Sequence, residues 1–142
     1  MENELMTSNM VEYSNDLKNA EMSAYCSIEP KTEEEAILIY NASNNPDKRL
    51  KDCIGEIISV KDVYCETVEL QNEQTGELSR SPRIVLIDDK GVSYTCVSFG
   101  IFNALKKLMA IFGTPTWEKP LKLKVKQISK GTRNLLTLEL VK

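Results

Sequence analysis

The sequence predicts a mainly β protein with two helices, and three observations carry this prediction. From residue 53 onward, segments with strand-like patterns follow one another between short turns. One amphipathic helical pattern interrupts them at residues 101–112. A second helical segment, at about residues 33–44, precedes them. We therefore expect a single domain over residues 32–142 that includes this early helix, and a flexible acidic N-terminal arm over residues 1–31.

The early helix is predicted from its two ends. Thr32 is followed three residues later by Glu35, the spacing of a capping box. An Asn-Asn-Pro sequence at residues 44–46 ends the pattern. Ile37 and Tyr40 fall on one face of this helix, and we expect that face to pack against the β-sheet.

The strands are predicted from runs of alternating apolar and polar residues. The runs cover residues 53–70, 84–87, 92–99, 121–128 and 135–141. In the first run the apolar positions change parity, which predicts a bulge near Gly55 or Ser59. Gly91 is expected at a hairpin position with positive φ, and Gly113 is expected to end the second helix.

The order of these elements, β-β-β-α-β-β, is the order of an OB-fold, a five-stranded, partly open barrel that binds single-stranded nucleic acid or oligosaccharide. Its fourth strand carries Lys122, Lys124 and Lys126 in alternation with apolar residues. A period of two places these three cations on one face. A phosphate backbone is the leading candidate for the anion opposite them. The alternative is that the lysines only confer solubility or protect a strand edge.

Charge is unevenly distributed along the chain, although its net value is only −3. Residues 1–50 contain 4 basic and 10 acidic side chains, whereas residues 101–142 contain 9 basic and 2 acidic ones. This polarity favours one anion-binding surface in the C-terminal third. It also permits the acidic segment to lie over that surface.

Single-stranded nucleic acid is held by cations along its backbone and by aromatic faces under its bases. Three aromatic residues are candidate stacking platforms, and each has an alternative: Tyr64 and Tyr94 as core residues, and Trp117 as a plug beneath the second helix. The predicted nucleic-acid-binding residues are Tyr64, Arg80, Arg83, Tyr94, Trp117, Lys122, Lys124, Lys126, Lys130 and Arg133.

Other site classes are disfavoured by composition. The chain has no histidine, and its four cysteines form no C-x-x-C pair, so we expect neither a metal site nor a cofactor, and free thiols in a cytoplasmic protein. No apolar run reaches the roughly 18 residues of a membrane span, and the first residues do not form a secretory signal.

Enzymatic function is disfavoured as well, because no catalytic motif is present. Asp88 and Asp89, with Glu56, would be the carboxylates of a metal-dependent nuclease. However, the two aspartates precede Lys90 and Gly91 in a sequence typical of a tight turn, and we favour that interpretation.

The sequence also resembles a family. YTCVSFGIFNALKKL at residues 94–108, IFGTPTW at residues 111–117 and the spaced lysines of residues 122–126 resemble small single-stranded DNA-binding proteins of bacteriophages and related mobile elements of Gram-positive bacteria. The similarity covers residues 30–142. It implies an OB-like protein that binds single-stranded DNA without sequence preference in replication or recombination, in the host cytoplasm if phage-encoded. Tyr94, Trp117 and the three lysines are the binding residues that it supports.

One departure concerns partners. Many bacterial single-stranded DNA-binding proteins recruit replication or recombination proteins through an acidic C-terminal tail, whereas this chain ends in Leu-Val-Lys and is acidic at its other end. The alternative function is therefore a protein–protein interaction module, a phage-encoded inhibitor or adaptor that uses the acidic arm. The oligomeric state and the choice between DNA and RNA stay open.

Overall fold

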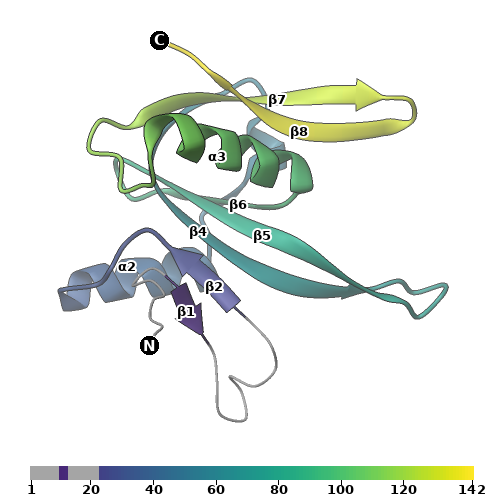
Figure 1. Cartoon of the computed structure of the whole chain (residues 1–142), viewed down its shortest axis with the longest axis horizontal. Coiled ribbons are helices and arrows are strands. Elements are labelled where there is room, and N and C mark those ends of the chain that lie inside the picture. The colour runs from purple at the N-terminus through teal and green to yellow at the C-terminus, as the bar shows by residue number, and fades with distance from the viewer. Residues whose placement is uncertain (1–9, 13–22) are drawn as a thin grey trace.

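A computed structural model describes residues 10–12 and 23–142 (Figure 1). It confirms a mainly β fold, with two helices among these described residues, and the first of the two has the predicted bounds. The elements are β1 (Met10–Glu12), β2 (Ser23–Cys26), α2 (Glu33–Asn44), β3 (Lys48–Arg49), the 3-10 turn η1 (Leu50–Cys53), β4 (Ile57–Gln71), β5 (Leu78–Asp88), β6 (Ser93–Val97), α3 (Phe99–Phe112), β7 (Leu121–Lys130) and β8 (Arg133–Leu140).

The strands form one curled sheet organised around β4. Along one edge, β4 pairs with β5 from Val60 to Gln71. Along its other edge it pairs first with β7, over Ile57–Val60, and then with β2, over Tyr64–Glu66. Strand β6 continues the sheet beyond β5, and β8 continues it beyond β7. The sheet thus runs in the order β8-β7-β4-β5-β6 and bends into a half-barrel.

Helix α3 lies between the two ends of this half-barrel (Figure 1). Among the described strands, β6 and β8 do not pair with each other, and α3 packs against β8 and β5 instead. The approach to β8 is close, because a Cβ atom on Gly100 would overlap the carbonyl oxygen of Leu136. The predicted β-β-β-α-β-β order is found in β4, β5, β6, α3, β7 and β8. The sheet of the described residues has eight strands rather than five, and α3 lies between β6 and β8.

The sheet has a core on each face. On the concave face, α3, β7 and β8 cover the larger core. Its buried members are Leu50, Cys53, Ile58, Val60, Val63, Ile84, Leu86, Tyr94, Ile101, Leu105, Trp117, Leu123 and Val125. On the convex face, α2 and residues 24–28 cover a smaller core, with buried members Ala24, Cys26, Ala42, Tyr64, Val85 and Ile87.

Part of the predicted N-terminal arm belongs to the folded domain, because it contributes to the smaller core. Residues 23–26, which were predicted to belong to a flexible arm, form a strand that pairs with β4 and buries Ala24 and Cys26. Burial of these small side chains against the sheet explains the docking. The acidic residues before them lie mostly outside the described residues, as does most of the predicted arm.

Helix α2 contacts the sheet through a different face from the predicted one. Ile37 and Tyr40 are 50% and 63% exposed, whereas Ala42 and Ile39 contribute to the smaller core. Ile39 and Ala42 are three residues apart and therefore share the helical face that contacts the sheet. No helix in the described part of the chain is long and apolar enough to cross a membrane.

The predicted bulge in the first long strand lies just beyond Ser59, between Val60 and Asp62. It turns the carbonyl of Lys61 toward the backbone N–H of Trp117, which donates to it at 2.9 Å. It also buries the Asp62 carboxylate, which accepts hydrogen bonds from Ser27 Oγ at 2.8 Å and from Thr116 Oγ1. The bulge therefore joins β2, β4 and the loop after α3.

The start of α2 provides a first prediction. The backbone N–H of Glu35 donates to Thr32 Oγ1 at 3.1 Å, and the backbone N–H of Lys31 donates to Glu35 Oε1 at 3.0 Å. Thr32→Ala removes the first bond and should lower the free energy of unfolding by about 1 kcal/mol in urea titrations. Ser43→Ala is the control, because the one hydrogen bond of its hydroxyl among the described residues goes to the carbonyl of Tyr40 within the same helix. Equal stability of the two variants would contradict the capping role.

Candidate nucleic-acid interface

The predicted lysines lie on the outer face of the β7–β8 hairpin. Leu123 and Val125 are fully buried, and the alternation of β7 turns Lys122, Lys124 and Lys126 to the opposite side. We call the cations on this face the basic hairpin surface: Lys122, Lys124, Lys126, Lys130 and Arg133. The structure thus brings together five of the ten predicted site residues.

These cations have few acidic neighbours. Glu139 of β8 lies opposite Lys124 in the strand register and makes an ion pair with Lys126 at 3.7 Å. Both side chains of this pair are about half exposed, so its contribution is small. Within the described part of the chain, Lys122 and Lys124 make no ion pair. One glutamate therefore faces three lysines.

The tip of the hairpin concentrates charge further. Lys130 and Arg133 are the last register pair before the turn at Gly131, so two cations stand directly opposite each other. Like charges in this position destabilise a strand pair unless an anion lies between them. Next to them, Ile128 and Leu135 also face each other and are 46% and 39% exposed. The tip therefore combines cations with an apolar pair that a base can contact.

The two predicted arginines lie on the other hairpin, β4–β5. Both hairpins project from the same side of the molecule (Figure 1). Arg83 makes an ion pair with Glu66 at 3.5 Å, and both side chains are about four-fifths buried. Arg80 is more exposed and lies 3.9 Å from Glu69. Each arginine thus faces an acid of β4, and the structure does not bring either into the basic hairpin surface.

The three predicted stacking residues lie in the core. Tyr64, Tyr94 and Trp117 are 5%, 7% and 5% exposed, so none presents a free ring face. The Tyr64 hydroxyl donates to Glu66 at 2.7 Å, and burial, with Asp88 nearby, raises the pKa of Tyr94 to about 12. Burying a large aromatic surface stabilises the fold more than leaving it exposed, which explains their positions. For Trp117, the alternative of packing beneath the helix is the observed one.

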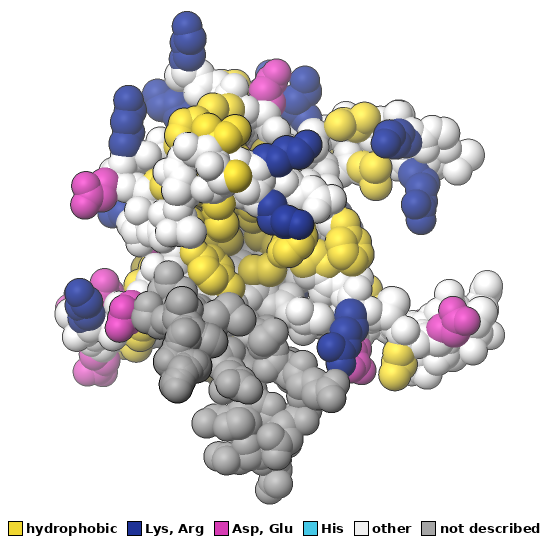
Figure 2. Space-filling model, viewed as in Figure 1, with side chains coloured by type: hydrophobic (Ala, Val, Ile, Leu, Met, Phe, Trp, Pro, Cys, Tyr) yellow, Lys and Arg dark blue, Asp and Glu magenta, His cyan; other side chains and the backbone are white. Residues whose placement is uncertain are grey.

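Exposed aromatic residues occur instead on α3, where the sequence reasoning did not place them. Phe99 is 57% exposed and Phe112 is 45% exposed. Phe102 is partly buried, with the ammonium group of Lys106 at 5.6 Å from its ring centre. Figure 2 shows hydrophobic side chains gathered over the middle of the molecule, where α3 lies, with basic side chains beside them. The sequence does contain a signal for this surface, because phenylalanines lie on either side of Lys106 and Lys107.

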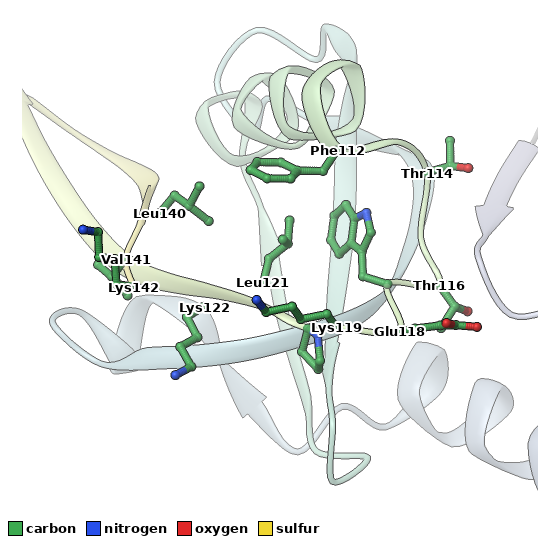
Figure 3. A pocket seen from close by; sticks show the side chains of 12 residues that line it. Phe112, Thr114, Thr116, Glu118, Lys119, Leu121, Lys122, Leu140, Val141 and Lys142 are labelled. Carbon is green, nitrogen blue, oxygen red and sulfur yellow. The ribbon is translucent and has the colours of Figure 1, made fainter.

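A pocket of about 750 Å³ lies between the C-terminal end of α3 and the starting end of β7 (Figure 3). Figure 3 shows the ring of Phe112 above Leu121, with Leu140 to one side and Lys119 and Lys122 below. The full lining consists of Phe112, Thr114, Thr116, Trp117, Glu118, Lys119, Pro120, Leu121, Lys122, Leu140, Val141 and Lys142. Lys122 belongs both to this pocket and to the basic hairpin surface.

The four cysteines are free thiols, and none of them is exposed. Burial raises the pKa of Cys96 to about 12 and, together with the neighbouring Glu66, that of Cys65 to about 11. Both thiols therefore stay protonated at neutral pH, which makes them poor nucleophiles and poor ligands. The described residues include no group of three or more side chains placed to hold a metal ion.

No curated protein and no solved structure matches the chain. One family, described as phage single-stranded DNA-binding protein of the phi29 type, matches over residues 18–141, which is most of the sequence. The resemblance inferred from residues 94–126 is thereby confirmed. The chain belongs to this family of phage single-stranded DNA-binding proteins.

Proposed function

We propose that this protein coats single-stranded DNA without sequence preference during phage DNA replication or recombination, in the host cytoplasm. The observation that carries the proposal is the basic hairpin surface, in which Lys130 faces Arg133 and, within the described residues, Lys122 and Lys124 make no ion pair. Membership of the family supports the ligand class.

The mechanism is neutralisation of phosphates by a row of cations. Same-face residues of a strand are about 6.8 Å apart, comparable to the separation of neighbouring phosphates on an extended single strand. Each phosphate that is neutralised releases condensed counterions, so salt weakens binding. None of these contacts reads a base edge, and binding therefore tolerates any sequence.

Bases find apolar surface next to the cations. Ile128 and Leu135 offer it at the hairpin tip, and Phe99 and Phe102 offer ring surface on α3. Contacts of this kind require unpaired bases, so they favour single strands over duplex.

Fluorescence anisotropy of a labelled oligo-dT tests the proposal. Binding should be tighter for oligo-dT than for a duplex of equal length. Log K should fall with log salt with a slope of about 0.7 per phosphate contact. The absence of binding at low salt would overturn the proposal and favour a protein partner for the acidic N-terminal segment.

A further inference from the structure

We infer that the pocket at the C-terminal end of α3 binds one unstacked nucleobase of the DNA strand, with an adjacent phosphate on its rim lysines. This inference rests on the proposed function and assigns a particular place to one base.

The walls of the pocket suit a flat aromatic ligand. Phe112 lies at one side and is 45% exposed, so part of its ring is free to stack. Leu121 lies opposite, and Leu140, which is 46% exposed, closes a third side. The volume of about 750 Å³ lies within the roughly 300–1,000 Å³ of small-molecule sites.

The walls are also held in place before any ligand binds. The indole Nε1–H of Trp117 donates to the carbonyl of Gly113 at 3.0 Å, and its backbone N–H donates to the carbonyl of Lys61 at 2.9 Å. On the far side, the backbone N–H of Val141 donates to the carbonyl of Lys122 at 2.9 Å. A preformed site loses little conformational entropy on binding.

Charge identifies the ligand as an anion with an apolar part. Lys119, Lys122 and Lys142 line the pocket, against the single acid Glu118. Within the described residues, none of these lysines makes an ion pair. An apolar peptide would leave the lysines without a partner, whereas a nucleotide places its base on the ring and its phosphate at the rim.

The position of Lys122 favours a strand over a free nucleotide. This lysine lines the pocket and begins the row that continues through Lys124 and Lys126. A strand that lies along this row therefore passes the rim of the pocket at Lys122. One base can enter while the following phosphates contact the row.

Trp117 is the only tryptophan of the chain, so its fluorescence reports directly on this pocket. We would follow Trp117 emission and the anisotropy of labelled oligo-dT in the same titration. Emission should change and saturate together with anisotropy. A rise in anisotropy with unchanged emission would overturn the pocket assignment and leave the proposed function intact. No rise in anisotropy would overturn the proposed function itself.

A pair of variants locates the effect. Phe112→Ala should weaken oligo-dT binding roughly 10-fold, the typical effect of losing one stacked base. Ile111→Ala is the matched control, because Ile111 is the preceding residue, is 74% exposed and does not line the pocket. Equal affinities of the two variants would overturn the inference.

A crosslinking experiment does not depend on either variant folding. Wild-type protein irradiated with an oligonucleotide containing 5-iodouracil should yield crosslinks at Phe112, located by mass spectrometry. Crosslinks confined to other residues would overturn the assignment. Thymidine monophosphate is the source control: if it changes Trp117 emission at the concentrations at which oligo-dT does, the pocket is a free-nucleotide site and the inference is wrong.

Discussion

Changing Lys122, Lys124 and Lys126 together to glutamate is expected to weaken binding of single-stranded DNA by about 100-fold or more at low salt. The three side chains form the row of cations on β7, and Glu139 is the acid beside them. Replacing the lysines by alanine instead should lower the slope of log K against log salt by about 2, because three contacts of about 0.7 each are lost. Anisotropy titrations from low to moderate salt measure both quantities.

The control is a variant with the same change in net charge elsewhere. Lys31, Lys51 and Lys90 are exposed and lie outside the basic hairpin surface. Changing these three to glutamate should weaken binding far less, and only through the general field of the protein. If both triple variants lose affinity equally, net charge and not the hairpin governs binding. Wild-type affinity in the first variant would show that the strand lies elsewhere.

Gly100→Ala is expected to destabilise the fold by about 2 kcal/mol. In an ordinary helical position this change is favourable, by roughly 0.5–1 kcal/mol. Here the added methyl group would overlap the carbonyl oxygen of Leu136, so either α3 or β8 must move. Helix α3 lies between β6 and β8, the two end strands of the half-barrel. A movement of α3 away from β8 therefore also disturbs Ile101 and Leu105, which are buried in the larger core. Urea unfolding gives the free energy directly.

Asn103→Ala is the matched control for this prediction. Asn103 lies in the same helix and is exposed, so alanine there should leave stability unchanged or raise it slightly. A Gly100→Ala variant as stable as Asn103→Ala would mean that α3 does not need its close approach to β8.

Local sequence signals predicted local structure well. Thr32 and Glu35 predicted the start of α2, and both side chains accept the expected kind of backbone hydrogen bond. Gly91 and Gly113 have positive φ, at 86° and 83°, where the turn and the helix end required it. The shared face of Lys122, Lys124 and Lys126 could be predicted from their spacing of two residues, because successive side chains of a strand point to opposite faces.

What the sequence did not predict depends on contacts between distant segments. The parity of Tyr64 and Tyr94 was compatible with either face, and which face is covered was decided by α2 and β2 on one side and α3 on the other. The burial of Trp117 depends on a carbonyl that the bulge at Lys61 turns toward it. Phe99 was predicted to end a strand over residues 92–99, whereas it begins α3, and both Phe99 and Phe112 are exposed on that helix.

The pairing of β7 with its neighbours divides the β7–β8 hairpin into two parts that differ in flexibility. Strand β4 pairs with its first residues, Leu121–Lys124, whereas residues 128–135 pair only with each other among the strands that the structure describes. Backbone hydrogen bonds at an end attached in this way open at a lower free energy than those in the body of a sheet. The backbone that carries Lys122 and Lys124 is therefore held by two neighbouring strands. The backbone that carries Lys130 and Arg133 is held by one and moves more easily. The tip of the β7–β8 hairpin can thus follow a DNA strand that changes direction while the core of the protein stays intact.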